Sequence, residues 1–303
     1  MDDRGSEETA MGIDVHTFHD VRSGTATHVV SCRTSGSCVV IDPVFDLDPK
    51  SGRTSRAPVD AVVEFIQAEN LRLEWILDTH VHHDHVSGAI ALREAVGGRI
   101  GIGRLVIEVG AAVRDVYALP DAATDEAVVD PFDRLLDEGD RLPFGEQTIE
   151  VWATPGHTVD HLSYRIGNAI FVGDTLFMPD SGTARCDFHR GDARRLYASI
   201  HRILAEPEET RLFVCHDYGA DGSRPPAWET TVGAQRTDNI HVGDGCGEEA
   251  FVALRRERDE GLDMPALLLA SLPLNIVAGR FPSPAANGRV ILAMPLDVPG
   301  HAI

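Results

Sequence analysis

The chain has 303 residues, 43% of them hydrophobic, which is enough to form one large α/β domain. Its 48 acidic residues outnumber 27 basic ones, and the formal net charge of -21 excludes nucleic acid and acidic membrane surfaces as favourable partners. No apolar run approaches the roughly 18 residues of a membrane span and the start lacks a signal-peptide pattern, so we expect a single domain over residues 1–303 in the cytoplasm.

The first part of the chain alternates between predicted strands and helices. β-branched residues separated by Gly and Ser indicate strands, and apolar residues at helical spacing, such as Val62 and Ile66, indicate helices. Predicted strands cover residues 12–19, 25–31, 38–41 and 73–77. Predicted helices cover residues 59–69, 87–96 and 104–119. The strand over 73–77 leads directly into a histidine-rich loop, which places that loop at the carboxyl end of a strand.

The second part repeats this alternation after an acidic connector over residues 121–137 that shows little periodicity. Predicted strands cover residues 141–143, 148–153, 162–166, 169–172 and 212–215, with a tight turn at Gly167 and Asn168. Predicted helices cover residues 192–204, 228–237 and 248–259. This order predicts a two-sheet sandwich with helices outside. Its core spans about residues 12–218, and a helical extension over 219–303 packs on that core.

The five cysteines are odd in number and never spaced as C-x-x-C. This pattern argues against a disulfide framework and against a Cys-rich zinc site. We therefore expect reduced thiols, with Cys186 among the candidate pocket residues.

The loop over residues 79–85 is the clearest candidate for a functional site. His80, His82, Asp84 and His85 are four potential ligands in six residues, and burying them unpaired would be costly. The cluster therefore predicts a divalent metal site. Isolated histidines are more often ordinary polar residues, and we interpret six of them in that way: His16, His19, His28, His189, His201 and His241.

Three later segments repeat the arrangement of an apolar strand followed by a metal-ligand type of residue. His157 lies in a turn after one such strand, Asp174 follows another, and His216 follows a third. Each feature alone is commonplace. Four strand ends that each supply such a residue are difficult to explain as coincidence.

These motifs together are recognisable. The H-x-H-x-D-H run at 80–85, the P-G-H-T turn at 155–158, the G-D-T strand end at 173–175 and the C-H-D-Y segment at 215–218 resemble the metallo-β-lactamase superfamily. The resemblance implies an α/β fold of the αβ/βα sandwich type, with two mixed β-sheets flanked by helices. It also implies two metal positions with Asp174 between them, one formed by His80, His82 and His157 and the other by Asp84, His85 and His216.

Within the superfamily, residues 173–177, 182–188 and 216–218 look like the persulfide dioxygenase group, which includes bacterial enzymes of sulfide oxidation. The resemblance implies one Fe²⁺ per chain, held by His80, His157 and Asp174. Two imidazoles and one carboxylate leave coordination positions open for O₂ and a thiolate-like sulfur ligand. The implied reaction oxidises glutathione persulfide with O₂ to sulfite and glutathione, while the remaining residues of the set orient ligands or carry protons.

Other residues receive roles from the same match. Arg185 is assigned to the glutathione carboxylate, because a guanidinium fork matches a carboxylate bidentately; the alternative is an ion pair with Asp187. Asn275 is assigned to a substrate contact. The match assigns catalytic roles to Asp84, His85 and Tyr218.

Two alternatives remain open from the sequence. A zinc hydrolase of a thioester or lactone, resembling glyoxalase II, would use one or two Zn²⁺ on the same ligand set. A non-catalytic sulfur-binding or sensing protein could use the fold as a scaffold, although the intact ligand set argues against this. The small-molecule persulfide and O₂ are the predicted partners, and a homodimer is left open.

Overall fold

Two six-stranded sheets form the centre of the computed structural model, which describes residues 12–117, 125–188, 190–243 and 245–298. The first sheet has the order β1-β2-β3-β6-β8-β9. Its strands are β1 (Ile13–His19), β2 (Ala26–Cys32), β3 (Ser37–Ile41), β6 (Arg72–Leu77), β8 (Arg99–Gly103) and β9 (Arg134–Leu136). The β1-β2-β3 ladder is antiparallel and β3, β6, β8 and β9 pair in parallel, so the sheet is mixed.

The second sheet has the order β10-β11-β12-β13-β14-β15 and is also mixed, because β13 and β14 pair in parallel. Its strands are β10 (Arg141–Phe144), β11 (Gln147–Ala153), β12 (Leu162–Ile166), β13 (Ala169–Gly173), β14 (Arg211–Val214) and β15 (Glu229–Thr231). The predicted turn at Gly167 and Asn168 is confirmed, since Ile166 pairs with Ala169 across it. A three-stranded sheet is formed by β4 (Val44–Asp48), β5 (Arg53–Ser55) and β7 (Val86–Ser87).

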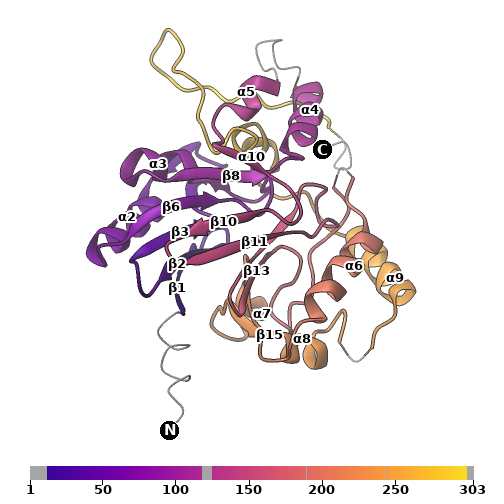
Figure 1. Cartoon of the computed structure of the whole chain (residues 1–303). Helices are drawn as coiled ribbons and strands as arrows, with labels where there is room; N and C mark the ends of the chain where they lie inside the picture. The colour runs from indigo at the N-terminus through magenta and orange to yellow at the C-terminus, as the bar shows by residue number, and fades with distance from the viewer. Residues whose placement is uncertain (1–11, 118–124, 189, 244, 299–303) are drawn as a thin grey trace.

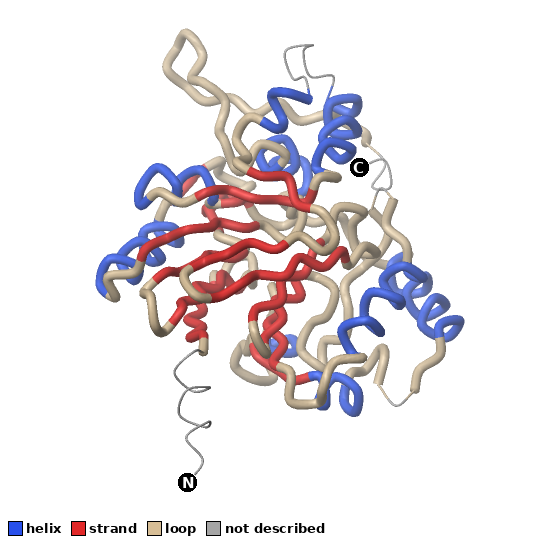
Figure 2. Tube along the Cα trace, in the orientation of Figure 1, coloured by secondary structure: helices blue, strands red, loops and turns tan. Residues whose placement is uncertain are grey.

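The two large sheets pack on each other and carry helices on their outer faces (Figures 1 and 2). Residues such as Val39 and Trp75 of the first sheet share one apolar cluster with Val151 and Phe171 of the second. The first sheet is covered by α2 (Ala57–Ala68), α3 (Ala89–Val96) and α4 (Val106–Tyr117). The second is covered by α6 (Ala193–Leu204), α8 (Val232–Asp238) and α9 (Glu248–Asp259). The αβ/βα sandwich predicted from the sequence is confirmed.

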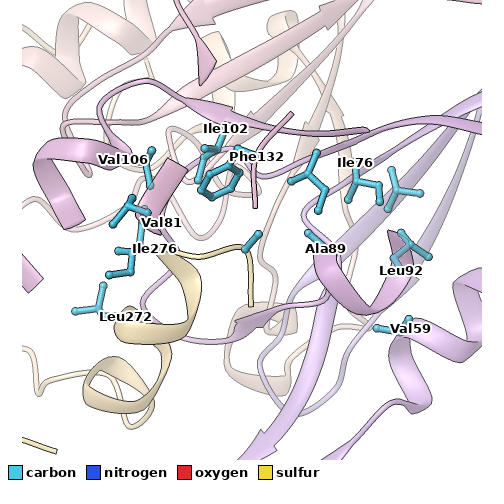
Figure 3. Packing of buried hydrophobic residues seen from close by; sticks show 14 of the residues in the cluster. Val59, Ile76, Val81, Ala89, Leu92, Ile102, Val106, Phe132, Leu272 and Ile276 are labelled. Atoms are coloured by element: carbon cyan, nitrogen blue, oxygen red, sulfur yellow. The ribbon is translucent and has the colours of Figure 1, made fainter. Parts of the chain in front are cut away.

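The C-terminal part returns to the first sheet. Helix α10 (Leu268–Asn275) places Leu272 in the apolar cluster that also contains Val81 and Val106, with Ile276 just after the helix (Figure 3). Val81 lies between two histidines of the histidine-rich loop, and its side chain is fully buried in this cluster. The loop is therefore anchored by an apolar residue on one side while the neighbouring imidazoles face the other way.

The structure differs from the prediction at several short elements. The connector over residues 121–137 contains α5 (Asp125–Val129) and β9, and residues 118–124 lie outside the described part of the chain. The predicted helix over 228–237 begins with strand β15, where Thr230 pairs with Leu212. Strand β8 is missing from the prediction because its glycines suggest a loop; a Cβ on Gly103 would lie 2.6 Å from the carbonyl oxygen of Asp160. The described part also contains α7 (Gly219–Gly222), which was not predicted.

His28 joins the two sheets and is the satisfied polar residue that the sequence indicates. Its Nε2 donates to the Val214 carbonyl oxygen at 3.1 Å, and its Nδ1 lies 2.9 Å from the Thr17 hydroxyl. Burial, against the opposing effect of the Val214 hydrogen bond, lowers the pKa of His28 from 6.5 to about 4.

We expect acid to destabilise the fold partly through His28. The unfolded chain protonates this imidazole as the pH falls below 6.5, whereas the folded chain keeps it neutral down to about pH 4. The free energy of unfolding should fall across this window by about 3 kcal/mol from this residue alone. Urea unfolding at pH 7 and pH 4.5 measures the fall, and His28→Gln should show a smaller one; an equal fall in the variant would contradict the assignment.

Candidate metal centre

Four strand ends from both sheets meet at one edge of the sandwich. The loop after β6 supplies His80 and its neighbours, His157 follows β11, Asp174 follows β13, and His216 follows β14. The side chains of His80, His157, Asp174 and His216 are buried. The convergence that the sequence predicts is therefore present in the structure.

His80, His157 and Asp174 form the first group of candidate ligands, with ligand atoms that all lie within 4.8 Å of one another. The Asp174 Oδ2 atom lies 3.5 Å from the Nε2 of His157 and 3.9 Å from the Nε2 of His80. Two imidazole nitrogens and one carboxylate oxygen therefore face a common point.

Hydrogen bonds on the far side of both rings fix their tautomers. His157 donates from Nδ1 to the Arg185 carbonyl oxygen at 2.7 Å, so its Nε2 keeps a lone pair when the ring is neutral. The Thr79 hydroxyl donates to Asp42 and lies 3.0 Å from the Nδ1 of His80, which can therefore donate to it. Both rings thus present an unprotonated Nε2 toward Asp174, the form that binds metal.

The second group contains His82, Asp84, His85 and His216, again within 4.8 Å of one another. The Nε2 of His216 lies 3.1 Å from Asp84 and 3.4 Å from the Oδ1 of Asp174, so Asp174 stands between the groups as predicted. His82 differs from the prediction that it shares a position with His80 and His157. Asp42 accepts a hydrogen bond from its Nε2 at 2.9 Å, and the ring lies with the second group.

The residues present fit a bound cation. The Nε2 atoms of His80, His85 and His216 are buried without a hydrogen-bond partner, as are the Nδ1 of His82 and the Oδ1 of Asp174. Each such atom would cost about 1–3 kcal/mol if it remained unsatisfied. Imidazole nitrogens and carboxylate oxygens are ligands that divalent metals accept. This is a metal-binding His/Asp cluster.

Three residues that the sequence analysis missed hold the cluster in place. The Nε2 of His161 accepts the backbone N–H of Asp174 at 2.9 Å, and its ring stacks on His80. Asp160 accepts the backbone N–H of Val81, and Asp42 accepts that of Thr79. Gly173 has a φ of 53°, and a Cβ there would lie 2.6 Å from His161. Single polar residues of this kind follow no sequence pattern, although D-H at 160–161 lies close to the turn histidine.

A cavity of about 610 Å³ opens onto the cluster, and its lining includes His157, Asp174 and His216. Tyr218 lines it with 61% exposure, and its hydroxyl donates to the Ser23 carbonyl oxygen at 2.9 Å. Arg185 also lines the cavity, but Asp187 accepts both arms of its guanidinium fork at 2.6 Å. The structure therefore contains the ion pair that the sequence left as the alternative for Arg185.

The prediction that Asn275 contacts substrate does not fit its surroundings. The side chain is 2% exposed and is not part of the cavity lining. Its Nδ2 donates to the carbonyl oxygens of His82 and His85 at 2.8 Å, and its Oδ1 accepts the N–H of Ser87 at 2.8 Å. All its polar atoms are thus engaged in fixing the backbone of the histidine-rich loop.

Comparison with known proteins agrees with this fold and site. Residues 20–216 match the family model of the Metallo-beta-lactamase superfamily, and the chain belongs to this superfamily. It is 46% identical to a Beta-lactamase hydrolase-like protein of Agrobacterium fabrum over 94% of this chain, and it spans 65% of the length of that relative. It is 45% identical to a Probable metallo-hydrolase of Burkholderia pseudomallei, covering 93% of this chain and 99% of that protein.

Relatives named for a reaction include two different activities. The crystal structure of ETHE1 from Myxococcus xanthus superposes with a TM-score of 0.68 at 27% identity, covering 88% of this chain and 100% of that one. The human Persulfide dioxygenase ETHE1 is 28% identical over 85% of both chains. A Hydroxyacylglutathione hydrolase of Rhodospirillum rubrum is 31% identical over 68% of this chain and 67% of that protein.

Proposed function

We propose that the protein is an iron-dependent persulfide dioxygenase. The overall reaction is glutathione persulfide plus O₂ plus water, giving glutathione, sulfite and two protons; the outer sulfur loses four electrons and O₂ gains them. The group of His80, His157 and Asp174 carries this proposal, because two histidines and one carboxylate with open positions suit a non-haem Fe²⁺ oxygenase. The likeness to proteins named ETHE1 in sequence and in fold supports it.

His80, His157 and Asp174 would hold one Fe²⁺ per chain. When bound, the iron would supply positions at which O₂ and the persulfide sulfur meet. The protein contributes the fixed tautomers of the two imidazoles and a cavity beside Phe188, whose ring contacts His157 edge-on at 5.6 Å. The apolar ring limits the access of water to that side of the group.

The second group would handle protons. Asp84 lies against His216 at 3.1 Å and against the Nδ1 of His85 at 3.4 Å, so a proton can pass between this carboxylate and two imidazoles, and Asp84 and His216 line the cavity. Asp84 and His85 are the proposed acid-base residues. Tyr218 keeps its proposed catalytic role at the cavity mouth, where its ring is parallel to that of His216.

Arg185 remains the proposed contact for a substrate carboxylate. We expect Arg185→Ala to raise KM about tenfold with little change in kcat, because the lost contact is the same in the ground state and the transition state. Steady-state O₂ consumption measures both constants. Asp187→Asn is the matched control, since it frees the guanidinium and should lower KM; a normal KM in the Arg185 variant would remove this role.

Metal analysis and an oxygen electrode test the proposed function. Protein purified without added metal should contain about one iron per chain and consume one O₂ per glutathione persulfide, with sulfite as the product. One or two zinc ions per chain, no O₂ consumption and turnover of a thioester would contradict it.

A zinc-dependent thioester or lactone hydrolase is the second candidate. The observation that favours it is the second ligand group, because its His216 lies 3.4 Å from Asp174 and the two groups together would offer ligands for two zinc ions. The similarity to a relative named Hydroxyacylglutathione hydrolase supports this second candidate function.

We propose a single domain that works in the cytoplasm on a small thiol persulfide and O₂. Within the described residues, no helix has the length and apolar character needed to span a membrane.

A further inference from the structure

The second group of candidate ligands also faces a second cavity, of about 170 Å³, which we call the acidic cavity. Its walls come from the turn between β1 and β2, from strand β4 and from the loop before α10. Asp84 lines both this cavity and the large one, whereas His85 lines only the acidic cavity. The metal centre can therefore be reached from two cavities.

The walls of the acidic cavity carry more negative than positive charge. The carboxylates of Asp20, Asp46 and Asp84 line it together with a single basic side chain, that of Arg22. Asp20 is hydrogen-bonded to a neighbouring serine and has no basic partner among the described residues. Arg22 lies 3.2 Å from Asp46 and 3.8 Å from Asp48, so two carboxylates share its charge. The cavity thus keeps an excess of negative charge.

The large cavity has the opposite balance. Apart from the candidate ligands, its lining contains two carboxylates and three guanidinium groups, whereas the acidic cavity has two carboxylates and one guanidinium group. The two carboxylates of the large cavity, Asp180 and Asp217, are also paired with Arg224. Apolar side chains such as Phe45 and Leu267 line the acidic cavity and strengthen its field, because they keep the local dielectric constant low. A cation is therefore attracted more strongly into the acidic cavity.

Candidate ligand atoms lead from the acidic cavity to the first group. His85 is 1% exposed, and its Nε2 is buried without a hydrogen-bond partner. Asp84 lies 3.1 Å from the Nε2 of His216, and the same Nε2 lies 3.4 Å from the Oδ1 of Asp174. The Oδ2 of Asp174 faces the two imidazoles of the first group. An ion that enters the acidic cavity can thus exchange one ligand for the next over short distances.

We propose that the acidic cavity is the route by which a divalent cation reaches the metal centre, with Asp84 and His85 as the first ligands that it meets. Carboxylates and imidazoles can replace the water molecules of such an ion one at a time. The large cavity is left for the substrate, so metal and substrate use separate openings. The inference does not depend on the proposed reaction, because the ion is loaded before any turnover.

A tryptophan that narrows the acidic cavity tests the route. Ala266 is exposed and lines only this cavity, and Ile240 is exposed and lines only the large one, so Ala266→Trp and Ile240→Trp form a matched pair. Metal-free full-length protein is mixed with Co²⁺ alone, without substrate, and uptake is followed by stopped-flow absorbance. Ala266→Trp should slow uptake about tenfold and slow release to a chelator by the same factor, since Kd is the ratio of the two rates and stays unchanged. Ile240→Trp should load at the wild-type rate.

Asp46→Asn tests the charge of the route without narrowing it. At low ionic strength it should slow Co²⁺ uptake about tenfold, and the difference should disappear near 1 M salt, where charges are screened within about 3 Å. Asp180→Asn is the matched control, because Asp180 lines only the large cavity. It should load like the wild type at both salt concentrations.

Slower uptake in Ile240→Trp, whether alone or equal to that in Ala266→Trp, would overturn the proposal. Wild-type uptake rates in both Ala266→Trp and Asp46→Asn would overturn it as well. The proposed reaction is tested separately, because a protein that consumes no O₂ can still show these uptake rates, and an active dioxygenase can load its ion through the large cavity.

Discussion

Replacement of Asp174 by alanine is expected to abolish both metal retention and activity. Its Oδ2 faces His80 and His157 and its Oδ1 faces His216, so one substitution removes an oxygen from both ligand groups. Two imidazoles alone leave the site without a compensating negative charge. The metal content after dialysis should fall from about one ion per chain to near zero, and kcat/KM should fall by at least about a thousandfold.

Asp180→Ala is the matched control for that measurement. Asp180 lines the same cavity but pairs with Arg224 rather than with the ligand groups. It should retain metal and most activity. A variant of Asp174 that kept its metal would refute the assignment of both groups.

Asn275→Ala should be the most destabilising of the substitutions considered. Its amide makes three hydrogen bonds to backbone groups of the loop over residues 82–87 in a buried environment. Losing them leaves two carbonyl oxygens and one N–H unsatisfied, which should lower the free energy of unfolding by about 3–5 kcal/mol. Because the loop carries His82 and His85, metal affinity should fall as well.

Ser271→Ala is the control for Asn275, since its hydroxyl lies on the same helix and makes only long contacts, at 3.4 Å with the His82 carbonyl oxygen and at 3.5 Å with that of Leu268. Urea unfolding and metal titration measure the effects. The KM of the metal-loaded fraction of Asn275→Ala should be normal. A raised KM with unchanged stability would instead restore the predicted substrate contact.

The sequence predicts the candidate ligands well because ligand-type residues gather at strand ends. Four of them lie within residues 80–85, and each of the others lies within four residues of the end of an apolar strand. The supports could not be predicted in this way. Asp42 and Asn275 are single polar residues in apolar stretches of the sequence, His161 belongs to no ligand motif, and only the folded chain brings them to the loop.

Helix α10 shows why part of the fold escaped prediction. Its residues are mostly apolar, with Pro273 inside the helix, so the segment has no amphipathic period. The helix is fixed by burial of Leu268 and Leu272 against the core rather than by local preference. Strand β15 is similar, because Thr230 extends along β14 although the segment before α8 suggested a helix.

The peptide unit of Arg185 has one further consequence. Its carbonyl oxygen orients the His157 ring, while the side chain of the same residue forms part of the cavity wall. If binding of a ligand in the cavity shifts this peptide, the shift would change the binding free energy of a metal ion held by His157. By thermodynamic reciprocity, binding of the metal ion would then change the affinity of the cavity for its ligand by the same factor. Metal binding and ligand binding would thus be linked through a single backbone amide.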